Sequence, residues 1–374
     1  MKVKHFPLWF IIIADVLLLA VGLCTFAYFH HIRILWAPFE KIEPTALERF
    51  ELPEGMGDFS ETLGMYFSSD DTVTKLSEDV KIRRFLTQNG YSVSEYPRSK
   101  YVGLYQSGDI FVTVEKIADI DYQLSDNETA MEIIYVYDIY IRNIENLYTS
   151  AYETRTSITN LVNNVDHLTN ASGESFTAGI PIAAFNGDYW GNKNHTLTAL
   201  RNGKLFIDAD AIESDILVLS YDGTMKVYTH ENYNKEKIQS ENPYQIWNFG
   251  PGLLDEDGYA LTEFNIDHYD KNVITTAHPR AGIGYYEPGH YCFVTVAGRQ
   301  DRAQGMRMVN FAKLFENLGC TVAYNMDGGG SSQSYFDGEI LYPGDDRNLF
   351  DIICIGEIKD KGMRTKSAEV TNHE

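Results

Sequence analysis

A strand–helix–strand pattern over residues 291–326 sets the tightest limit on how this chain folds. Residues 291–297 and 321–326 are apolar and rich in β-branched and aromatic side chains, which is typical of buried strands. Residues 306–318 between them repeat their apolar positions with the period of a helix, and Gly319 is placed to end it. Because a helical crossover joins strands that run the same way, we expect these two strands to be parallel, with a right-handed connection.

Weaker signals predict further strands upstream and few helices. The chain holds 25 Tyr, 20 Phe and 29 Gly, a composition that favours strands and turns over a helical bundle. Asp222-Gly223 lies between two apolar runs and predicts a hairpin. We therefore predict an α+β fold with a mixed β-sheet core and a C-terminal strand–helix–strand unit. The other expected elements are strands at 109–117, 132–141, 180–185, 215–221, 225–229 and 351–358, and a helix at 157–168 capped by Thr156 or Ser157.

The N-terminus carries an apolar run over residues 6–29, interrupted only by Asp15. At about 1.5 Å per residue, this run is long enough to cross a hydrocarbon core of about 30 Å. Lys2 and Lys4 precede it and favour a cytoplasmic amino end. We expect residues 1–30 to be an uncleaved signal anchor, a transmembrane helix that makes the chain a single-pass protein of the cell membrane with its main domain extracytoplasmic. A cleaved signal peptide and a buried soluble helix are the alternatives.

Composition divides the rest of the chain into three parts. Residues 31–130 begin with Pro, Gly and mixed charge, and we interpret them as a stalk and a small N-terminal region with a short amphipathic helix near 73–86. Residues 131–358 hold most of the strand signals and form the expected main domain. Residues 359–374 are a polar tail.

Charge, cysteine content and motifs exclude several classes of function. The net charge of −22 and the lack of a basic block argue against a nucleic-acid partner. The four cysteines show no metal spacing, so no zinc ribbon and no metal are expected, and Cys292, Cys320 and Cys354 are interpreted as buried thiols. No P-loop lysine and no dinucleotide fingerprint are present, so we expect no cofactor. The oligomeric state is left open.

Three expected strands end in polar, glycine-rich segments, where ligands gather in parallel α/β sheets. Each segment places carboxylate, amide or guanidinium groups beside backbone that a ligand can approach closely. Consecutive glycines followed by serines can form a nest of N–H groups for a phosphate, although each segment alone is also compatible with a simple tight turn. The segments are Asn186-Gly187-Asp188-Tyr189-Trp190-Gly191, Gly298-Arg299-Gln300-Asp301 and Asn325-Met326-Asp327-Gly328-Gly329-Gly330-Ser331-Ser332.

The order and content of such blocks resemble the phosphodiester glycosidase domain family. The resemblance runs from about Glu132 to Glu357, and its blocks are specific only in combination. Besides the first and third segments above and Gly298-Arg299, the blocks are Asn248-Phe249-Gly250-Pro251-Gly252-Leu253-Leu254, His278-Pro279-Arg280-Ala281-Gly282-Ile283-Gly284 and Gly305-Met306.

The resemblance implies a hydrolase whose substrate is a sugar with a phosphodiester on its anomeric carbon. Such a reaction passes through an oxocarbenium-like centre and needs a carboxylate, and the departing phosphate needs a cation and N–H donors. We expect Asp327 to be the main catalytic carboxylate, Asp188 a second one and His278 a general acid. Arg280 is the expected phosphate clamp. The remaining expected substrate- and phosphate-binding residues are Asn186, Arg299, Asn325, Gly328, Gly329 and Ser331.

Each of these roles has a structural alternative. Asp327 can cap its turn, Arg280 can pair with an acidic neighbour, and His278 before a proline can be structural. Arg299 can form a salt bridge with Asp301. The predicted function is thus a membrane-anchored extracytoplasmic hydrolase acting on surface polysaccharide or glycoconjugate. The alternative is a non-catalytic carbohydrate-binding or exopolysaccharide assembly protein on the same fold.

Overall fold

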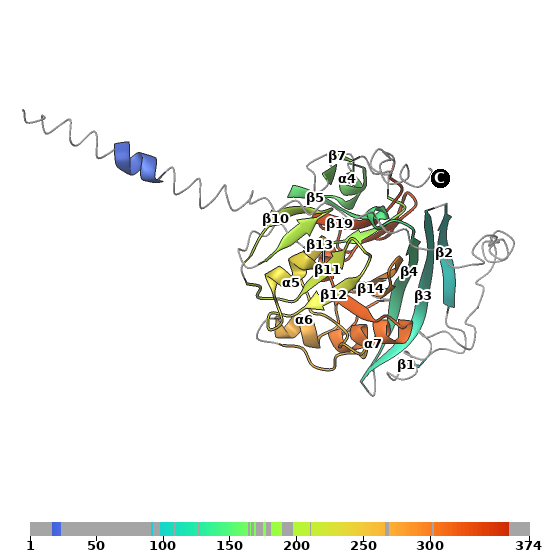
Figure 1. Ribbon diagram of the computed structural model, residues 1–374. Coiled ribbons are helices and arrows are strands. Elements are labelled where there is room, and N and C mark those ends of the chain that lie inside the picture. The colour runs from blue at the N-terminus through green and yellow to red at the C-terminus, as the bar shows by residue number, and fades with distance from the viewer. Residues whose placement is uncertain are drawn as a thin grey trace, which may run out of the picture.

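The computed structural model describes most of the chain between residues 91 and 358, together with a short N-terminal piece. β-Sheets form the body, and short helices lie on its surface (Figure 1). The described ranges are 17–23, 91–92, 98–107, 109–125, 128–163, 165, 168–169, 175–176, 181–188, 197–209, 211–265, 269–300 and 303–358.

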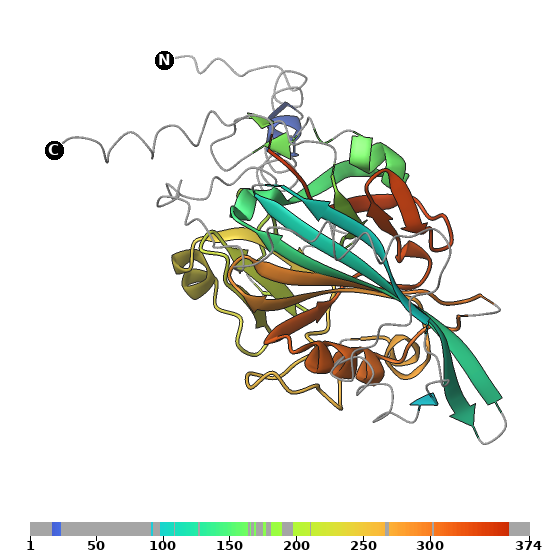
Figure 2. The ribbon, with the colours of Figure 1, turned by 90° about the vertical axis from the view of Figure 1, so that its right-hand side faces the viewer.

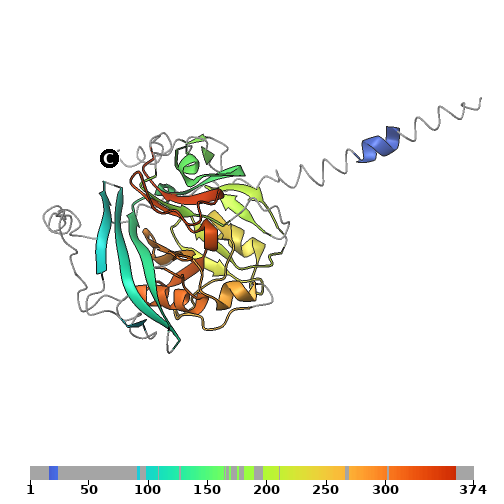
Figure 3. The same ribbon diagram turned by 180° about the vertical axis from the view of Figure 1, so that it is seen from behind.

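The largest sheet has seven strands in the order β1-β3-β4-β15-β14-β16, with β2 paired to β3. The β3–β4 hairpin is its longest part and extends beyond the body (Figure 2), and β2, β3 and β4 line one side of the molecule (Figure 3). The strands are β1 (Tyr91–Ser92), β2 (Arg98–Gln106), β3 (Ile110–Ser125), β4 (Glu128–Ile141), β14 (Arg280–Glu287), β15 (His290–Val296) and β16 (Val322–Asn325).

Two five-stranded sheets and a two-stranded one complete the β-structure of the described residues. One five-stranded sheet has the order β18-β17-β8-β19-β5, and the other β10-β9-β13-β11-β12. Their bounds are β5 (Leu147–Thr156), β8 (Ala183–Asn186), β9 (Ala199–Arg201), β10 (Lys204–Ile207), β11 (Ile216–Ser220), β12 (Met225–Tyr228), β13 (Pro243–Asn248), β17 (Ser334–Phe336), β18 (Glu339–Tyr342) and β19 (Leu349–Ile355). The small sheet pairs β6 (Leu168–Thr169) with β7 (Ser175–Phe176).

The helices are short. They are α4 (Ile158–Asn163), α5 (Lys235–Ser240), α6 (Lys271–Thr275) and α7 (Met308–Leu318), with 3-10 turns η3 (Ile144–Asn146) and η5 (Gly329–Ser331). Helix α7 ends where the sequence predicts, because Gly319 takes a left-handed conformation with φ 83°. Helix α4 begins at Ile158 and Ser157 caps it, since its Oγ accepts from the Asn160 N–H at 3.2 Å, but the helix ends at Asn163 and not at residue 168, where strand β6 starts.

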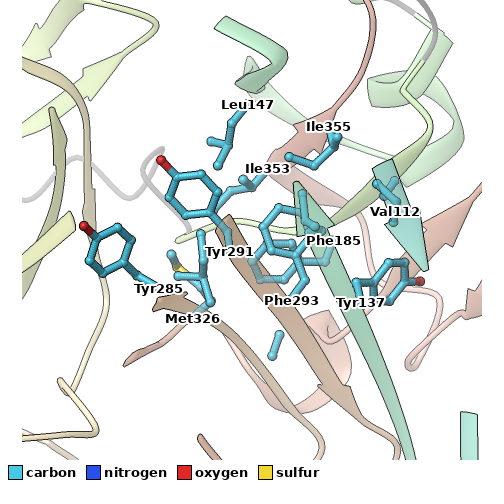
Figure 4. Close-up of a cluster of buried hydrophobic side chains, with 14 of the residues drawn as sticks. Val112, Tyr137, Leu147, Phe185, Tyr285, Tyr291, Phe293, Met326, Ile353 and Ile355 are labelled. Atoms are coloured by element: carbon cyan, nitrogen blue, oxygen red, sulfur yellow. The ribbon is translucent and has the colours of Figure 1, made fainter. Parts of the chain in front are cut away.

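One apolar core joins the three large sheets. It contains Phe185 from β8, Phe293 from β15 and Trp247 from β13, all inaccessible to solvent. The rings of Phe185 and Phe293 lie 4.3 Å apart between centroids and bring the first two sheets into direct contact (Figure 4). Because these side chains come from strands that end near the polar segments, the core fixes how those strand ends meet.

The two strands of the predicted strand–helix–strand unit do run parallel, and a third strand lies between them. Strands β15 and β16 both pair antiparallel with β14, so they run parallel to each other with β14 between them. Every pairing between named strands in the described part of the chain is antiparallel. The ends of β15 and β16 still share one edge, because both are antiparallel to the same strand. The sheet-rich α+β class and the β11–β12 hairpin around Asp222-Gly223 are confirmed.

Much of the N-terminal prediction lies outside the described residues. Residues 17–23 are helical and exposed, but within the described ranges no helix has the length and apolar character needed to cross a membrane. The rest of the 6–29 run, the helix expected near 73–86 and the tail at 359–374 are not among the described residues. The domain boundary near residue 130 stays a prediction, although β3 and β4 continue the same sheet across it.

Candidate functional site

Two strand ends from different sheets meet at the candidate site. Strand β8 ends at Asn186, and β16 leads into Asp327. The Asp327 N–H donates to the Gly187 carbonyl at 3.2 Å, and Asn186 Nδ2 donates to the Asp327 carbonyl at 2.5 Å. Asn186 Oδ1 accepts from the Gln333 N–H at 3.0 Å, so one buried amide holds both ends of the glycine-rich loop. Asn186 is thus a positioning residue for Asp327.

A small hollow opens where these strand ends meet. Its volume is about 190 Å³, counting the open space at its mouth. The wall combines acidic, amide and aromatic side chains, a mixture suited to a polar ligand with an apolar face. It is lined by Asn186, Gly187, Asp327, Ser331, Asn348, Leu349, Phe350 and Asp351.

Asp327 is the half-buried carboxylate of this hollow. Burial raises its pKa from 3.8 to about 6, and the negative charge of Asp188 adds to the rise. A hydrogen bond from Ser331 and the positive charges of Arg347 and Arg155 oppose that shift. At neutral pH the group is therefore mostly ionised but weakly solvated, which suits a carboxylate that stabilises positive charge or accepts a proton.

Two arginines bring positive charge to the hollow. Arg347 is exposed, and its Nη1 donates to Ser331 Oγ at 3.4 Å. Arg155, also exposed, lies over the Phe350 ring at 5.2 Å from its centroid. In a chain with a net charge of −22, these guanidinium groups form a local cationic rim around Asp327.

Beneath the hollow lies a second, fully buried carboxylate–guanidinium network. Arg201 Nη2 donates to Asp188 Oδ1 at 2.6 Å and lies 3.5 Å from Asp351 Oδ2. The other Asp188 oxygen accepts from the Asn248 N–H at 2.6 Å. Both Asp188 oxygens are therefore occupied and its side chain is 0% exposed, which disfavours its predicted role as a second catalytic carboxylate.

Asp351 is a site residue that the sequence reasoning missed. Burial, followed by the charge of Asp188, raises the pKa of Asp351 well above its ordinary range. It packs flat against Gly187, where an added Cβ would lie 2.4 Å from the Asp351 carboxyl carbon. Its signal in the sequence is a single acidic residue at the start of the apolar strand that we predict at 351–358.

Arg280 lies in the structure as a buried support. Its Nε donates to the Met306 carbonyl at 2.8 Å, and its Nη2 donates to the carbonyls of Val273 and Thr276 at 2.6 and 3.1 Å. Burial lowers its pKa to about 10. These contacts tie the end of α6 to the segment before α7 and favour a structural role. The phosphate clamp predicted at Arg280 stays untested and is disfavoured by this geometry.

His278 and Arg299 are close enough for the charge of the arginine to act on the imidazole. His278 Nε2 is 2.7 Å from Thr276 Oγ1, and burial together with the charges of Arg280 and Arg299 lowers the pKa of the imidazole. The neutral form therefore dominates near pH 7, which does not suit the predicted general acid. Arg299 pairs at 3.0 Å with Asp345. The predicted alternative partner, Asp301, lies outside the described residues, so that alternative is not tested.

The glycines of the loop allow close approach of its neighbours. A Cβ on Gly329, whose φ is +61°, would lie 2.9 Å from the Arg299 guanidinium, and one on Gly328 would lie 3.1 Å from the Pro279 carbonyl. The Gly329 N–H donates to that same carbonyl at 2.9 Å. The glycine-rich loop is thus joined to Pro279, and the second predicted segment reaches the loop through Arg299.

Asn325 supports a neighbouring loop. Its Nδ2 donates to the Gly250 carbonyl at 2.7 Å, and its backbone N–H donates to the Pro251 carbonyl at 3.1 Å across the cis Gly250–Pro251 bond. Asn325 is 1% exposed, so its expected contact with a sugar hydroxyl is disfavoured. Within the described ranges, no group of three His, Cys, Asp or Glu side chains is arranged to hold a metal ion.

Comparison with known proteins agrees with the family resemblance read from the sequence. The family model for phosphodiester glycosidases matches residues 180–355. The SPbeta prophage-derived uncharacterized protein YomE of Bacillus subtilis (strain 168) is 30% identical over 164 residues, which are 43% of this chain and 25% of that protein. The match therefore spans about a quarter of that relative's length.

Among solved structures, the fold is similar to the catalytic domain of zebrafish N-acetylglucosamine-1-phosphodiester alpha-N-acetylglucosaminidase, auto-inhibited by its pro-peptide. The TM-score is 0.50 at 15% identity, covering 69% of this chain and 87% of that one. At this identity the likeness concerns the fold. A hypothetical protein from Synechocystis overlaps less, with a TM-score of 0.35 at 10% identity over 68% of this chain and 75% of that one.

Proposed function

We propose that the chain, whose residues 180–355 match the family model for phosphodiester glycosidases, hydrolyses the bond between a sugar's anomeric carbon and a phosphodiester. One observation carries the proposal for this chain. Asp327, a half-buried carboxylate of raised pKa, lines the hollow, and the guanidinium groups of Arg347 and Arg155 contact two other lining residues, Ser331 and Phe350. A sugar phosphodiester needs negative charge at its anomeric carbon and positive charge at its phosphate.

Asp327 faces the sugar in this proposal. Its ionised carboxylate stabilises the positive charge that develops at the anomeric carbon, or takes a proton from the attacking water. Asn186 and the Gly187 carbonyl fix its backbone from one side, and Ser331 orients its side chain. Such prior fixing matters because an enzyme gains rate only when its charges need not reorganise during the reaction.

Arg347 and Arg155 face the phosphate, in place of Arg280. A phosphate is already a competent leaving group when its charge is neutralised, so a guanidinium fork is more useful than a proton donor. Arg347 is exposed and reaches Ser331 in the hollow, whereas Arg280 is buried under three carbonyl contacts. The Phe350 ring and the exposed Asn348 amide supply an apolar and a polar surface for the sugar itself.

We place the substrate in a surface polysaccharide or glycoconjugate. The apolar 6–29 run supports an anchor that holds the hydrolase extracytoplasmically at the membrane, where such polymers are made and trimmed. A catalytically silent carbohydrate-binding protein is the competing reading, and it predicts binding without turnover.

A release assay with a panel of synthetic sugar-1-phosphodiesters tests the proposal. The wild-type chain should release sugar and phosphomonoester from at least one member. Asp327→Asn should abolish most of that release and still bind the sugar by calorimetry. Asp222→Asn is the matched control, because Asp222 caps an exposed hairpin turn and does not line the hollow. Binding without release by the wild-type chain would replace the hydrolase with the non-catalytic alternative.

A further inference from the structure

Two buried thiols face each other beside strand β14. Cys292 Sγ and Cys320 Sγ lie 3.5 Å apart, and the two residues are 0% and 4% exposed. Cys292 is near the start of β15, and Cys320 follows α7 just before β16. They therefore lie at the end of the strand–helix–strand unit away from the loops that carry Arg299 and Asp327.

Gly284 of strand β14 leaves room in the sheet for both sulfur atoms. Gly284 of β14 pairs with Cys292 on one side and Ala323 on the other. A Cβ on Gly284 would lie 2.6 Å from Cys320 Sγ and 2.7 Å from Cys292 Sγ. Any side chain at this position would push the sulfurs away, so the glycine lets β15 and the turn after α7 bring them together.

We propose that Cys292 and Cys320 form a disulfide bond in an oxidising compartment. A disulfide has an S–S distance of about 2.0 Å, so the sulfurs need to close by only about 1.5 Å. Each thiol loses its proton, and the pair gives two electrons to a thiol oxidant whose own disulfide is reduced to two thiols. The bond closes the loop from Cys292 to Cys320, which contains α7 and the segment of Arg299.

The bond forms during folding. Burial and the neighbouring Cys320 raise the pKa of the Cys292 thiol well above its ordinary range, so the folded chain offers little thiolate to an oxidant. The unfolded segment has no such barrier. Once formed, the bond restricts the unfolded chain and braces the two strands whose far ends hold the candidate site.

Refolding the full chain tests the proposal independently of its enzymatic activity. The chain is unfolded under reduction, refolded with oxidised or with reduced glutathione, alkylated in denaturant and digested for mass spectrometry. After oxidative refolding, a peptide pair linked through Cys292 and Cys320 is expected. Cys354 is the internal control, because it is equally buried with its sulfur 3.9 Å from the Ile352 carbonyl, and it should be fully alkylated.

Thermal unfolding supplies the second measurement. The oxidised chain should melt about 5–10 °C above the reduced chain. Denaturing the oxidised sample with dithiothreitol and refolding it should abolish the difference in melting temperature in wild type and in Cys354→Ser. Cys292→Ser should show no such difference before or after this treatment. If Cys292→Ser does not fold, the wild-type comparison still decides. Full alkylation of Cys292 and Cys320 after oxidative refolding, or a link from either to Cys24, would overturn the proposal.

Discussion

Two groups of carboxylates and guanidinium groups lie close together in this protein. They have similar composition but differ in solvent exposure and in how many of their oxygen atoms are already bonded. In the lower one, Arg201 and Asp188 are 1% and 0% exposed and 2.6 Å apart, and both Asp188 oxygens are occupied. In the upper one, Asp327 lines an open hollow and Arg347 is exposed. Both oxygens of the buried Asp188 are already bonded, whereas the upper group keeps one face toward solvent.

The difference shows why residue type alone does not identify a catalytic carboxylate. A buried ion pair is costly to form and more costly to break, so it specifies the fold. A half-buried carboxylate with distant counter-charges keeps a raised pKa and can still meet a substrate. Both groups touch the segment 186–188, so the buried pair can fix the backbone from which the open pair is positioned.

Neutralising Asp327 should have the largest effect on activity. Asp327→Asn should lower kcat by roughly two to four orders of magnitude, the range for lost acid–base or electrostatic help. The melting temperature should stay equal or rise by about 2–4 °C at pH 8, because a charge that is costly to bury is removed. Steady-state kinetics and calorimetry on one preparation measure both. A near-native kcat would remove Asp327 from the mechanism.

Breaking the buried pair should mainly cost stability. Arg201→Met leaves Asp188 and Asp351 without their cation, a change expected to cost about 3–5 kcal/mol of the free energy of unfolding. The melting temperature should fall by about 10 °C. Arg347→Met is the matched control and should shift it by no more than about 2 °C, because Arg347 is exposed. Equal shifts in the two variants would erase the contrast between the groupings.

The phosphate clamp can be located by paired lysine substitutions. Arg347→Lys should lower kcat/KM by roughly 10-fold to 100-fold, the worth of a charged hydrogen bond, because an ammonium lacks the bidentate fork. Arg280→Lys should lower the melting temperature instead, since lysine cannot hold the carbonyls of Val273, Thr276 and Met306 together. Activity lost in Arg280→Lys at unchanged stability would return the clamp to Arg280.

The acid limb of the pH profile should report on Asp327. If the ionised form is needed, kcat should fall about tenfold for each pH unit below about 6, the pKa that burial gives this group. Since the folded-state pKa lies above the ordinary 3.8, folding takes up a proton, and this group's contribution to stability is lost as pH rises from about 4 to about 6. Asp327→Asn should lose that pH dependence in its residual activity. If the acid limb of the pH profile is unchanged in the variant, a group other than Asp327 titrates there.

Local patterns in the sequence predicted the helices, strands and turns that are determined by neighbouring residues. Strong periodicity located α7 and the β15 and β16 strands, and Asp222-Gly223 located a hairpin, because these signals act within a few residues. The parallel direction of β15 and β16 was predicted, but the strand between them was not, because β14 precedes this pattern in the sequence and joins β16 by a long-range pairing. Nothing in residues 291–326 encodes that third strand.

The sequence predicted where the candidate site lies better than it predicted what each residue does there. The segments at 186–188 and 325–332 do meet, and Asp327 lies in the hollow. The roles of Asp188, Arg280 and Asn325 depend on which oxygen or nitrogen is already bonded, and their partners lie in strands or loops far away in sequence. Arg347, Arg155 and Asp351 carry no motif, and only the fold brings them to the hollow.

Asn186 lies where two sheets meet, so we expect the local motions of strands β8 and β16 to be coupled. Asn186 bonds the backbone of the 327–333 segment at both ends, and its own strand shares the Phe185–Phe293 contact with the other sheet. Moving the 327–333 segment away from β8 therefore requires the Asn186 amide to release both bonds. Amide hydrogen exchange in β8 and β16 should then slow together when a ligand fills the hollow, while exchange in β11 and β12 should not change.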